Sequence, residues 1–221
     1  MIRTLPHKRQ SDKCRNCGAA CLAMIFEYYK KPGKIKEITN SISDVFNNAP
    51  SCRNYLMVRY ASDRGFPCCV VSAKDIRTFI PFCLNQGYEL IISYHTHPPE
   101  ADSSRRRLGH MAVVVGVGGE NVYVNDPEKD KPDGLCAPLA FEFLESRMKT
   151  RGGDDEITGD NVVMVLSPLK ANRAKAILRV PEDNDSHEVF VFEDLRDMVN
   201  FVLDANKNRW VKLAANSGEA P

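Results

Sequence analysis

The chain has 221 residues, of which 43% are hydrophobic and 27% are charged, and its 30 basic and 29 acidic residues leave a formal charge of +1. This composition is typical of one sizeable globular domain, or of one domain with a small appendage. The near-neutral balance excludes the strongly basic proteins that bind nucleic acid or anionic membranes through their overall charge.

Two local features bear on the compartment of the protein. No apolar run approaches the ~20 residues that a membrane-spanning helix needs, and the basic first residues lead into no apolar segment of a secretory signal. We therefore expect a cytoplasmic protein whose eight cysteines are mostly reduced. Export, or delivery into another cell, by a route that leaves no readable signal stays open.

The first predicted helix begins at Cys17, after a polar approach segment that covers residues 1–16. Apolar residues recur at helical spacing on most sides of the run C-G-A-A-C-L-A-M-I-F-E-Y-Y, which predicts a central, nearly buried helix. Pro32 and Gly33 end this helix. Two weaker helical patterns follow, at residues 34–47 and 51–64.

Beyond Gly65 the pattern changes to strands. Apolar and β-branched runs predict strands at residues 67–71, 89–94 and 161–166, with helices at residues 75–86 and 139–148. Two further apolar runs, 111–117 and 122–125, flank a Gly-rich turn and predict a β-hairpin. Helices that precede a mainly antiparallel sheet indicate an α+β fold rather than alternating βαβ units.

The pattern of the sequence changes again near Pro168, after the last predicted strand of the sheet. We expect one domain at residues 1–168 and a small appendage of unknown role at residues 169–221. Within the appendage we expect strands at residues 177–180 and 188–192 and a helix at residues 195–203. The last residues, 214–221, should fray.

Cys17 is the first residue with reactive chemistry. A thiol in the first turn of a helix lies at the positive end of the helix dipole and beside free N–H groups, which favours the thiolate. Gly18 leaves room for a substrate carbonyl, and the Cys17 N–H can serve as an oxyanion donor. The alternative interpretation is a buried structural cysteine.

His110 and Asp126 stand at matching positions of the predicted hairpin. His110 opens one apolar strand after a polar loop, and Asp126 ends the partner strand sixteen residues later. Antiparallel pairing should bring the two side chains together, so that the carboxylate orients an imidazole that acts on the thiol. Gln10, upstream of Cys17, can point its amide at the oxyanion. The alternatives are a turn-forming aspartate and an exposed loop glutamine.

Three ordered motifs resemble the C39-type peptidases, a papain-like family known for the bacteriocin-processing domains of bacteria. The run that begins Asn16-Cys17-Gly18 resembles the family's D-C-G-x-A-C-L-A-M, with a glutamine upstream. The strands G-H-M-A-V-V-V-G, at residues 109–116, and V-Y-V-N-D-P, at residues 122–127, resemble its G-H-F-V-V-V-x-G and v-x-v-x-D-P strands. The resemblance covers about residues 5–168.

The resemblance implies a papain-like fold in which N-terminal helices pack on a mainly antiparallel sheet. It also implies a catalytic set in which Cys17 is the nucleophile, His110 the general base and acid, Asp126 the orienting group and Gln10 the oxyanion donor. The sequence departs from the family at Asn16, where an aspartate is usual, and in the spacing of Gln10, which requires one extra residue before Cys17. These 221 residues contain no counterpart of the family's transporter parts, so we expect a stand-alone domain.

We predict a cysteine peptidase that cleaves a peptide or protein substrate through a thioester acyl-enzyme, without a cofactor and without a nucleic-acid partner. One alternative is a glutamine deamidase or transglutaminase-like effector or toxin, and another is a non-catalytic peptide-binding module. The Arg-rich loop at residues 95–108 is a candidate substrate rim, and residues 169–221 are a candidate docking element.

A metal site is not expected. Cys14 and Cys17 form a C-x2-C element, but the sequence has no second ligand pair at zinc spacing. Cys14 is instead a candidate for masking Cys17 in a disulfide.

Overall fold

The computed structural model describes residues 2–10, 16–46, 49–52, 54–66, 68–73, 75–96, 109–148, 161–167, 176–181 and 187–192. Its helices are α1 (Cys17–Tyr28), α2 (Ile35–Ile42), α3 (Asn54–Asp63), α4 (Ile76–Asn85) and α5 (Phe141–Arg147). Its strands are β1 (Ser43–Phe46), β2 (Ala49–Cys52), β3 (Cys68–Ser72), β4 (Glu89–His95), β5 (Gly109–Gly118), β6 (Asn121–Asn125), β7 (Ala137–Ala140), β8 (Val162–Leu166), β9 (Ala176–Pro181) and β10 (His187–Phe192). None of the described helices has the length and apolar character that crossing a membrane requires.

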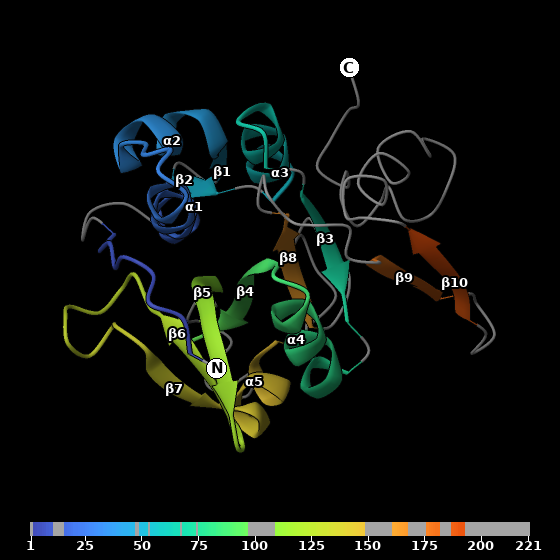
Figure 1. Cartoon of the computed structure of the whole chain (residues 1–221). Coiled ribbons are helices and arrows are strands. Elements are labelled where there is room, and N and C mark those ends of the chain that lie inside the picture. Colours follow the sequence, from blue (N-terminus) through green and yellow to red (C-terminus); the bar gives the residue numbers. More distant parts are fainter. Residues whose placement is uncertain are drawn as a thin grey trace.

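A six-stranded antiparallel sheet forms the centre of the molecule, in the order β3-β8-β4-β5-β6-β7. The helices α1, α2 and α3 lie on one face, and α4 and α5 lie on the other (Figure 1). This arrangement confirms the predicted α+β fold, in which the N-terminal helices pack on a mainly antiparallel sheet.

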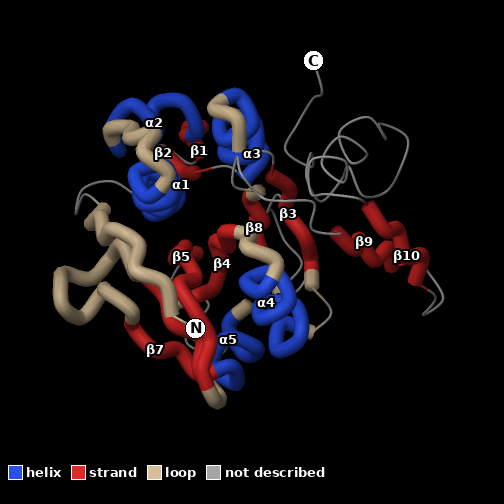
Figure 2. Tube along the Cα trace, in the orientation of Figure 1, coloured by secondary structure: helices blue, strands red, loops and turns tan. Residues whose placement is uncertain are grey.

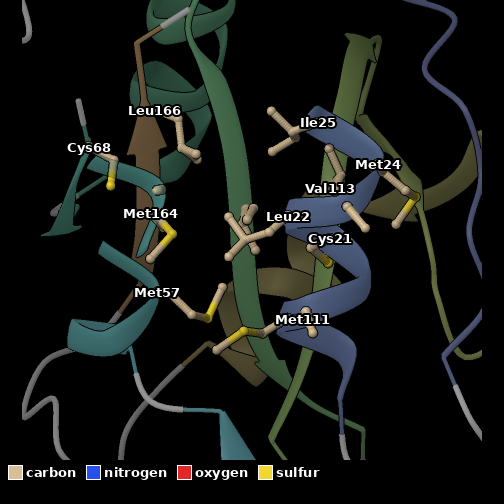
Figure 3. Packing of buried hydrophobic residues seen from close by; sticks show 14 of the residues in the cluster. Cys21, Leu22, Met24, Ile25, Met57, Cys68, Met111, Val113, Met164 and Leu166 are labelled. Carbon is tan, nitrogen blue, oxygen red and sulfur yellow. The ribbon is translucent and has the colours of Figure 1, made fainter. Parts of the chain in front are cut away.

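The central strands β8, β4 and β5 are buried on both faces, so alternate side chains enter two separate cores. On β5, Met111, Val113 and Val115 face the α1 side, whereas Ala112 and Val114 face the side of α4 and α5. Figure 3 shows the core on the α1 side, where Leu22 lies among the methionine side chains of α3, β5 and β8.

Helix α1 is the most buried of the described helices, and it is nearly buried as predicted. All ten residues from Cys17 to Phe26 are buried, because α1 lies between the sheet and the helices α2 and α3. Its apolar character all round is therefore required by its position. The burial fixes the start of the helix against the sheet.

The sequence reading missed three strands. The two helical segments predicted at residues 34–47 and 51–64 were too long, because the hairpin β1–β2 separates α2 from α3. The helix predicted at residues 139–148 begins at Phe141, after the edge strand β7. Strand β7 exists because it pairs with β6, a long-range interaction that leaves no local pattern.

The strands expected at residues 177–180 and 188–192 are present as β9 and β10, which pair antiparallel. The helix expected at residues 195–203 and the terminal residues 214–221 lie outside the described residues, as does all but the first two residues of the loop at residues 95–108.

Candidate active site

The candidate nucleophile lies where α1 begins. Cys17 is the first residue of the helix and is 9% exposed. Asn16, the residue before it, accepts the N–H of Ala20 with its carbonyl and directs its side-chain amide to the hydroxyl of Thr39, at 3.4 Å. The Asn16 side chain makes no capping hydrogen bond to α1. The N–H groups of the first turn are therefore not taken up by this residue, which suits an oxyanion site.

The predicted hairpin is present as β5 and β6. The pairing runs from Gly118 opposite Asn121 to Val113 opposite Asn125, with a shift in register between Val114 and Gly116. His110 lies beyond the last residue of β5 that pairs with β6. The chain turns as soon as β6 ends, so Asp126 reaches His110 from a turn and not from a paired position of the ladder.

The two side chains form a buried hydrogen bond. Nε2 of His110 donates to Oδ1 of Asp126 at 2.7 Å, and the residues are 4% and 3% exposed. The same Oδ1 accepts the N–H of Glu128 at 2.9 Å, and Nζ of Lys129 lies 3.8 Å from Oδ2. Because Nε2 is engaged by Asp126, Nδ1 is the ring nitrogen left for Cys17, whose side chain interacts with the imidazole.

The electrostatics of this pair favour two charged partners. Burial alone would lower the pKa of His110, but the hydrogen bond to Asp126 and the interaction with Cys17 outweigh it and raise the pKa to about 9. Burial also opposes ionisation of Asp126, yet the bonds from His110 and from the Glu128 N–H lower its pKa. At neutral pH the pair is an imidazolium and a carboxylate.

Tyr94 is a site residue that the sequence reading missed. It lies opposite His110 in the pairing of β4 with β5, and the two rings meet edge to face with centroids 5.3 Å apart. Burial raises the pKa of the Tyr94 hydroxyl, which therefore stays neutral. The register of β4 on β5 is the signal that would have placed it, and one sequence does not supply that register.

The site draws on residues of both cores. Cys17 belongs to the core on the α1 side, whereas Tyr94, which contacts His110, belongs to the core under α4 and α5. The nucleophile and the base are thus supported by different layers of the fold. Their separation depends on how α1 is seated on the sheet.

Gln10 lies at the loop that carries Asp126. Its N–H donates to the carbonyl of Pro127 at 2.8 Å, and its side-chain Oε1 is buried without a hydrogen-bond partner in the described part of the chain. The extra residue expected between Gln10 and Cys17 falls within residues 11–15, which lie outside the described residues, as does Cys14. The role of Gln10 as oxyanion donor stays a prediction.

Among the described residues, His110, Asp126 and Glu128 bring donor atoms within 4.8 Å of one another, so they are the set that could hold a cation. Nδ1 of His110 lies 4.0 Å from the carboxylate of Glu128, which is largely exposed. Nε2 and Oδ1 are already bonded to each other. The arrangement therefore fits acid–base chemistry directly, and we assign no metal to it.

The solved structures that resemble the chain include three peptidase domains. A double-glycine-motif protease from an AMS/PCAT transporter, in complex with its leader peptide, is 17% identical, with a TM-score of 0.50 over 76% of this chain and 94% of that one. A putative C39-like peptidase from Bacillus anthracis is 17% identical, with a TM-score of 0.53 over 74% and 94%. The peptidase domain of Streptococcus ComA, a bifunctional ABC transporter involved in quorum sensing, is 20% identical, with a TM-score of 0.50 over 73% and 97%.

No protein-family model and no curated protein sequence matches the chain. The structural similarity nevertheless extends over nearly the whole of each C39-type domain. At this level of identity it is the fold that is shared. The chain has the papain-like α+β fold of the C39-type cysteine peptidase domains.

Proposed function

We propose that the chain is a cysteine peptidase in which Cys17 is the nucleophile and His110 the general base and acid. Asp126 orients the imidazole, and Gln10 donates to the oxyanion. The observation that carries the proposal is the buried 2.7 Å contact between His110 and Asp126, on an imidazole that also interacts with the thiol at the head of α1.

Acylation uses Cys17 as a thiolate and His110 as an imidazolium. The thiolate of Cys17 attacks the carbonyl carbon of the scissile amide, a C–S bond forms, and the carbonyl electrons move onto oxygen. The N–H of Cys17 and the amide of Gln10 stabilise that oxyanion. His110 then gives its Nδ1 proton to the departing amine as the C–N bond breaks, which leaves a thioester on Cys17.

Deacylation reverses the proton flow. Neutral His110 takes a proton from water, the resulting hydroxide attacks the thioester carbonyl, and the C–S bond breaks to release a carboxylic acid product. The proton returns to the His110–Cys17 pair. Asp126 keeps Nε2 protonated throughout, so that Nδ1 is the nitrogen that exchanges protons.

A peptide is the substrate class that we propose. Support comes from the double-glycine-motif protease, whose structure contains a bound leader peptide. The same thioester would form from the side-chain amide of a glutamine, so the chemistry of the triad alone does not select a backbone amide. The distinction has to come from the products.

Mass spectrometry of one designed peptide separates the outcomes. The peptide contains a Gly-Gly pair, a glutamine and a lysine, and it is incubated with the wild-type chain or with Cys17→Ala. We expect two fragments whose masses sum to that of the peptide plus one water, and only with the wild type. A gain of about one dalton in an uncut peptide would mean deamidation, and loss of ammonia with a new cross-link would mean transamidation. Either result, or tight binding without any change of mass, would contradict the peptidase proposal.

A further inference from the structure

The N-terminal strap, residues 2–10, lies along the hairpin that carries His110 and Asp126 (Figures 1 and 2). Ile2 bridges to Gly116, and the N–H of Arg3 donates to the carbonyl of Val115 at 2.8 Å. Val115 is the extra residue at the register shift of β5. The strap is therefore bonded to the hairpin where its ladder is interrupted.

The strap also holds the turn that carries Asp126. His7 donates from Nε2 to the carbonyl oxygen of Asp126 at 2.8 Å, and the N–H of Gln10 donates to the carbonyl of Pro127 at 2.8 Å. On its other side the backbone of Asp126 donates its N–H to the carbonyl of Gly134, also at 2.8 Å. Both backbone groups of Asp126 are thus bonded while its side chain meets His110.

At Gly134 the space between His7 and the turn that carries Asp126 is tightly filled. A Cβ atom at residue 134 would lie 2.6 Å from Nε2 of His7, 2.6 Å from the carbonyl oxygen of Lys129 and 2.7 Å from that of Asp126. Each of these distances is well below a normal carbon contact. Only glycine fits between His7 and the turn without moving the backbone that carries Asp126.

We propose that His7 is a positioning residue, which fixes the backbone of Asp126 through the carbonyl contact and so keeps the carboxylate in line with His110. The inference rests on the proposed function, since it assigns a support to one member of the proposed triad. Its physical basis is that any shift of the Asp126 backbone moves the carboxylate with it, out of its 2.7 Å contact with His110, and displacement by about 1 Å suffices to impair such a site.

The test follows the imidazolium of His110 without requiring peptide cleavage. Iodoacetate alkylates the Cys17 thiolate, and its negative charge is attracted by the imidazolium, so the rate falls where His110 loses its proton. For the wild type we expect this fall in the alkylation rate, the alkaline limb of the pH profile, near pH 9. Asp126→Asn should move the limb to lower pH, and His7→Ala should move it the same way by about one pH unit.

Two further variants separate positioning from general destabilisation. His7→Gln keeps an N–H donor and should restore the wild-type limb. Lys8→Ala is the matched control, because Lys8 is the next residue of the strap but forms its ion pair with Glu27 on α1, away from the Asp126 turn. Gly134→Ala crowds the contact between His7 and the Asp126 turn while keeping His7, and it should also shift the alkaline limb to lower pH.

Melting temperatures are recorded for every variant. If His7→Ala and Gly134→Ala lower the melting temperature but leave the limb at the wild-type pH, His7 is only structural and the inference is overturned. If one of these two variants does not fold, the alkaline limb of the other variant decides the test. If Asp126→Asn leaves the limb in place, the proposed triad itself is wrong. If instead the limb moves in Asp126→Asn but stays in place in His7→Ala and Gly134→Ala, only the inference about His7 is wrong.

Discussion

Two buried carboxylates on the same sheet behave in opposite ways. Asp126 follows the end of β6 and Glu89 begins β4, and they are 3% and 0% exposed. Each is bonded to a basic group, Asp126 to His110 at 2.7 Å and Glu89 to Arg3 at 2.5 Å. The pKa of Asp126 is nevertheless lowered, whereas burial raises the pKa of Glu89.

Each carboxylate accepts two hydrogen bonds on one of its oxygens, so the difference lies in the surroundings of the other oxygen. Asp126 accepts the imidazole and a backbone N–H, with Lys129 beside its second oxygen. Glu89 accepts both Arg3 and the Tyr29 hydroxyl on Oε1, while its buried Oε2 has no hydrogen-bond partner in the described residues. With a cation beside its second oxygen, the Asp126 carboxylate can stay charged next to a base that gains and loses a proton, whereas Glu89 ties the strap and α1 to the sheet.

The comparison predicts that the Asp126 side of the sheet governs activity and the Glu89 side governs stability. The largest effect should come from Cys17→Ala, which removes the attacking atom and should lower kcat/KM by about 10⁴-fold or more. Alanine suits the start of a helix, so the melting temperature should barely change. Peptide cleavage and thermal unfolding measure the two quantities. Cys136→Ala is the control, and a Cys17→Ala chain that still cleaves would contradict the assignment.

Asp126→Asn should have the next largest effect. It leaves the imidazole without a charged partner, so we expect kcat/KM to fall by about 10²- to 10⁴-fold. The alkaline limb of kcat/KM should move from near pH 9 toward the ordinary imidazole value of ~6.5. A full pH profile of both chains checks this. An unchanged limb would show that Asp126 does not support the His110 charge.

Glu89→Ala should do the reverse. Removing one partner of a buried ion pair leaves Arg3 and Tyr29 without their acceptor, and should lower the free energy of unfolding by about 3–5 kcal/mol. Activity at a temperature where the variant is folded should be unchanged. Urea unfolding measures the loss, and Glu89→Gln, which keeps an acceptor oxygen, should lose less. A stable but inactive Glu89→Ala chain would break the comparison.

Alkaline pH should weaken the fold by a smaller amount. Because folding raises the pKa of His110 to about 9, its charge contributes stability that is fully present below ~6.5 and is lost as the pH rises through 9. The loss should be at most about 3 kcal/mol. The measurement is urea unfolding at pH 7 and pH 10 for the wild type and for His110→Ala. Other groups titrate in this range, so the account requires a larger loss in the wild type than in the variant.

The features that could be predicted from the sequence are those with local causes. Helix α1 could be predicted because it is apolar on most sides. The β5–β6 hairpin could be predicted because two apolar runs flank a Gly-rich turn. The β1–β2 pair and β7 exist through pairing of short segments without a distinctive composition. The register shift at Val115 likewise coincides with a hydrogen bond from Arg3 of the strap, which no window of sequence around β5 contains.

The site divides in the same way. Cys17, His110 and Asp126 could be singled out because each residue type stands at a distinctive position of a helix or strand. Tyr94 and His7 could not, since one acts across a strand pair and the other across a strap 119 residues away from Asp126. Chemistry-bearing residues are thus easier to find in a sequence than the residues that hold them in place.

One measurement tests the central claim most directly: the order in which iodoacetamide labels the cysteines of the folded chain near neutral pH, followed peptide by peptide. Cys17 is buried and Cys136 is more exposed, so access alone would favour Cys136. The account predicts that Cys17 reacts first and that His110→Ala abolishes this order. Labelling of Cys136 before Cys17 in the wild type would contradict an activated thiol at the head of α1.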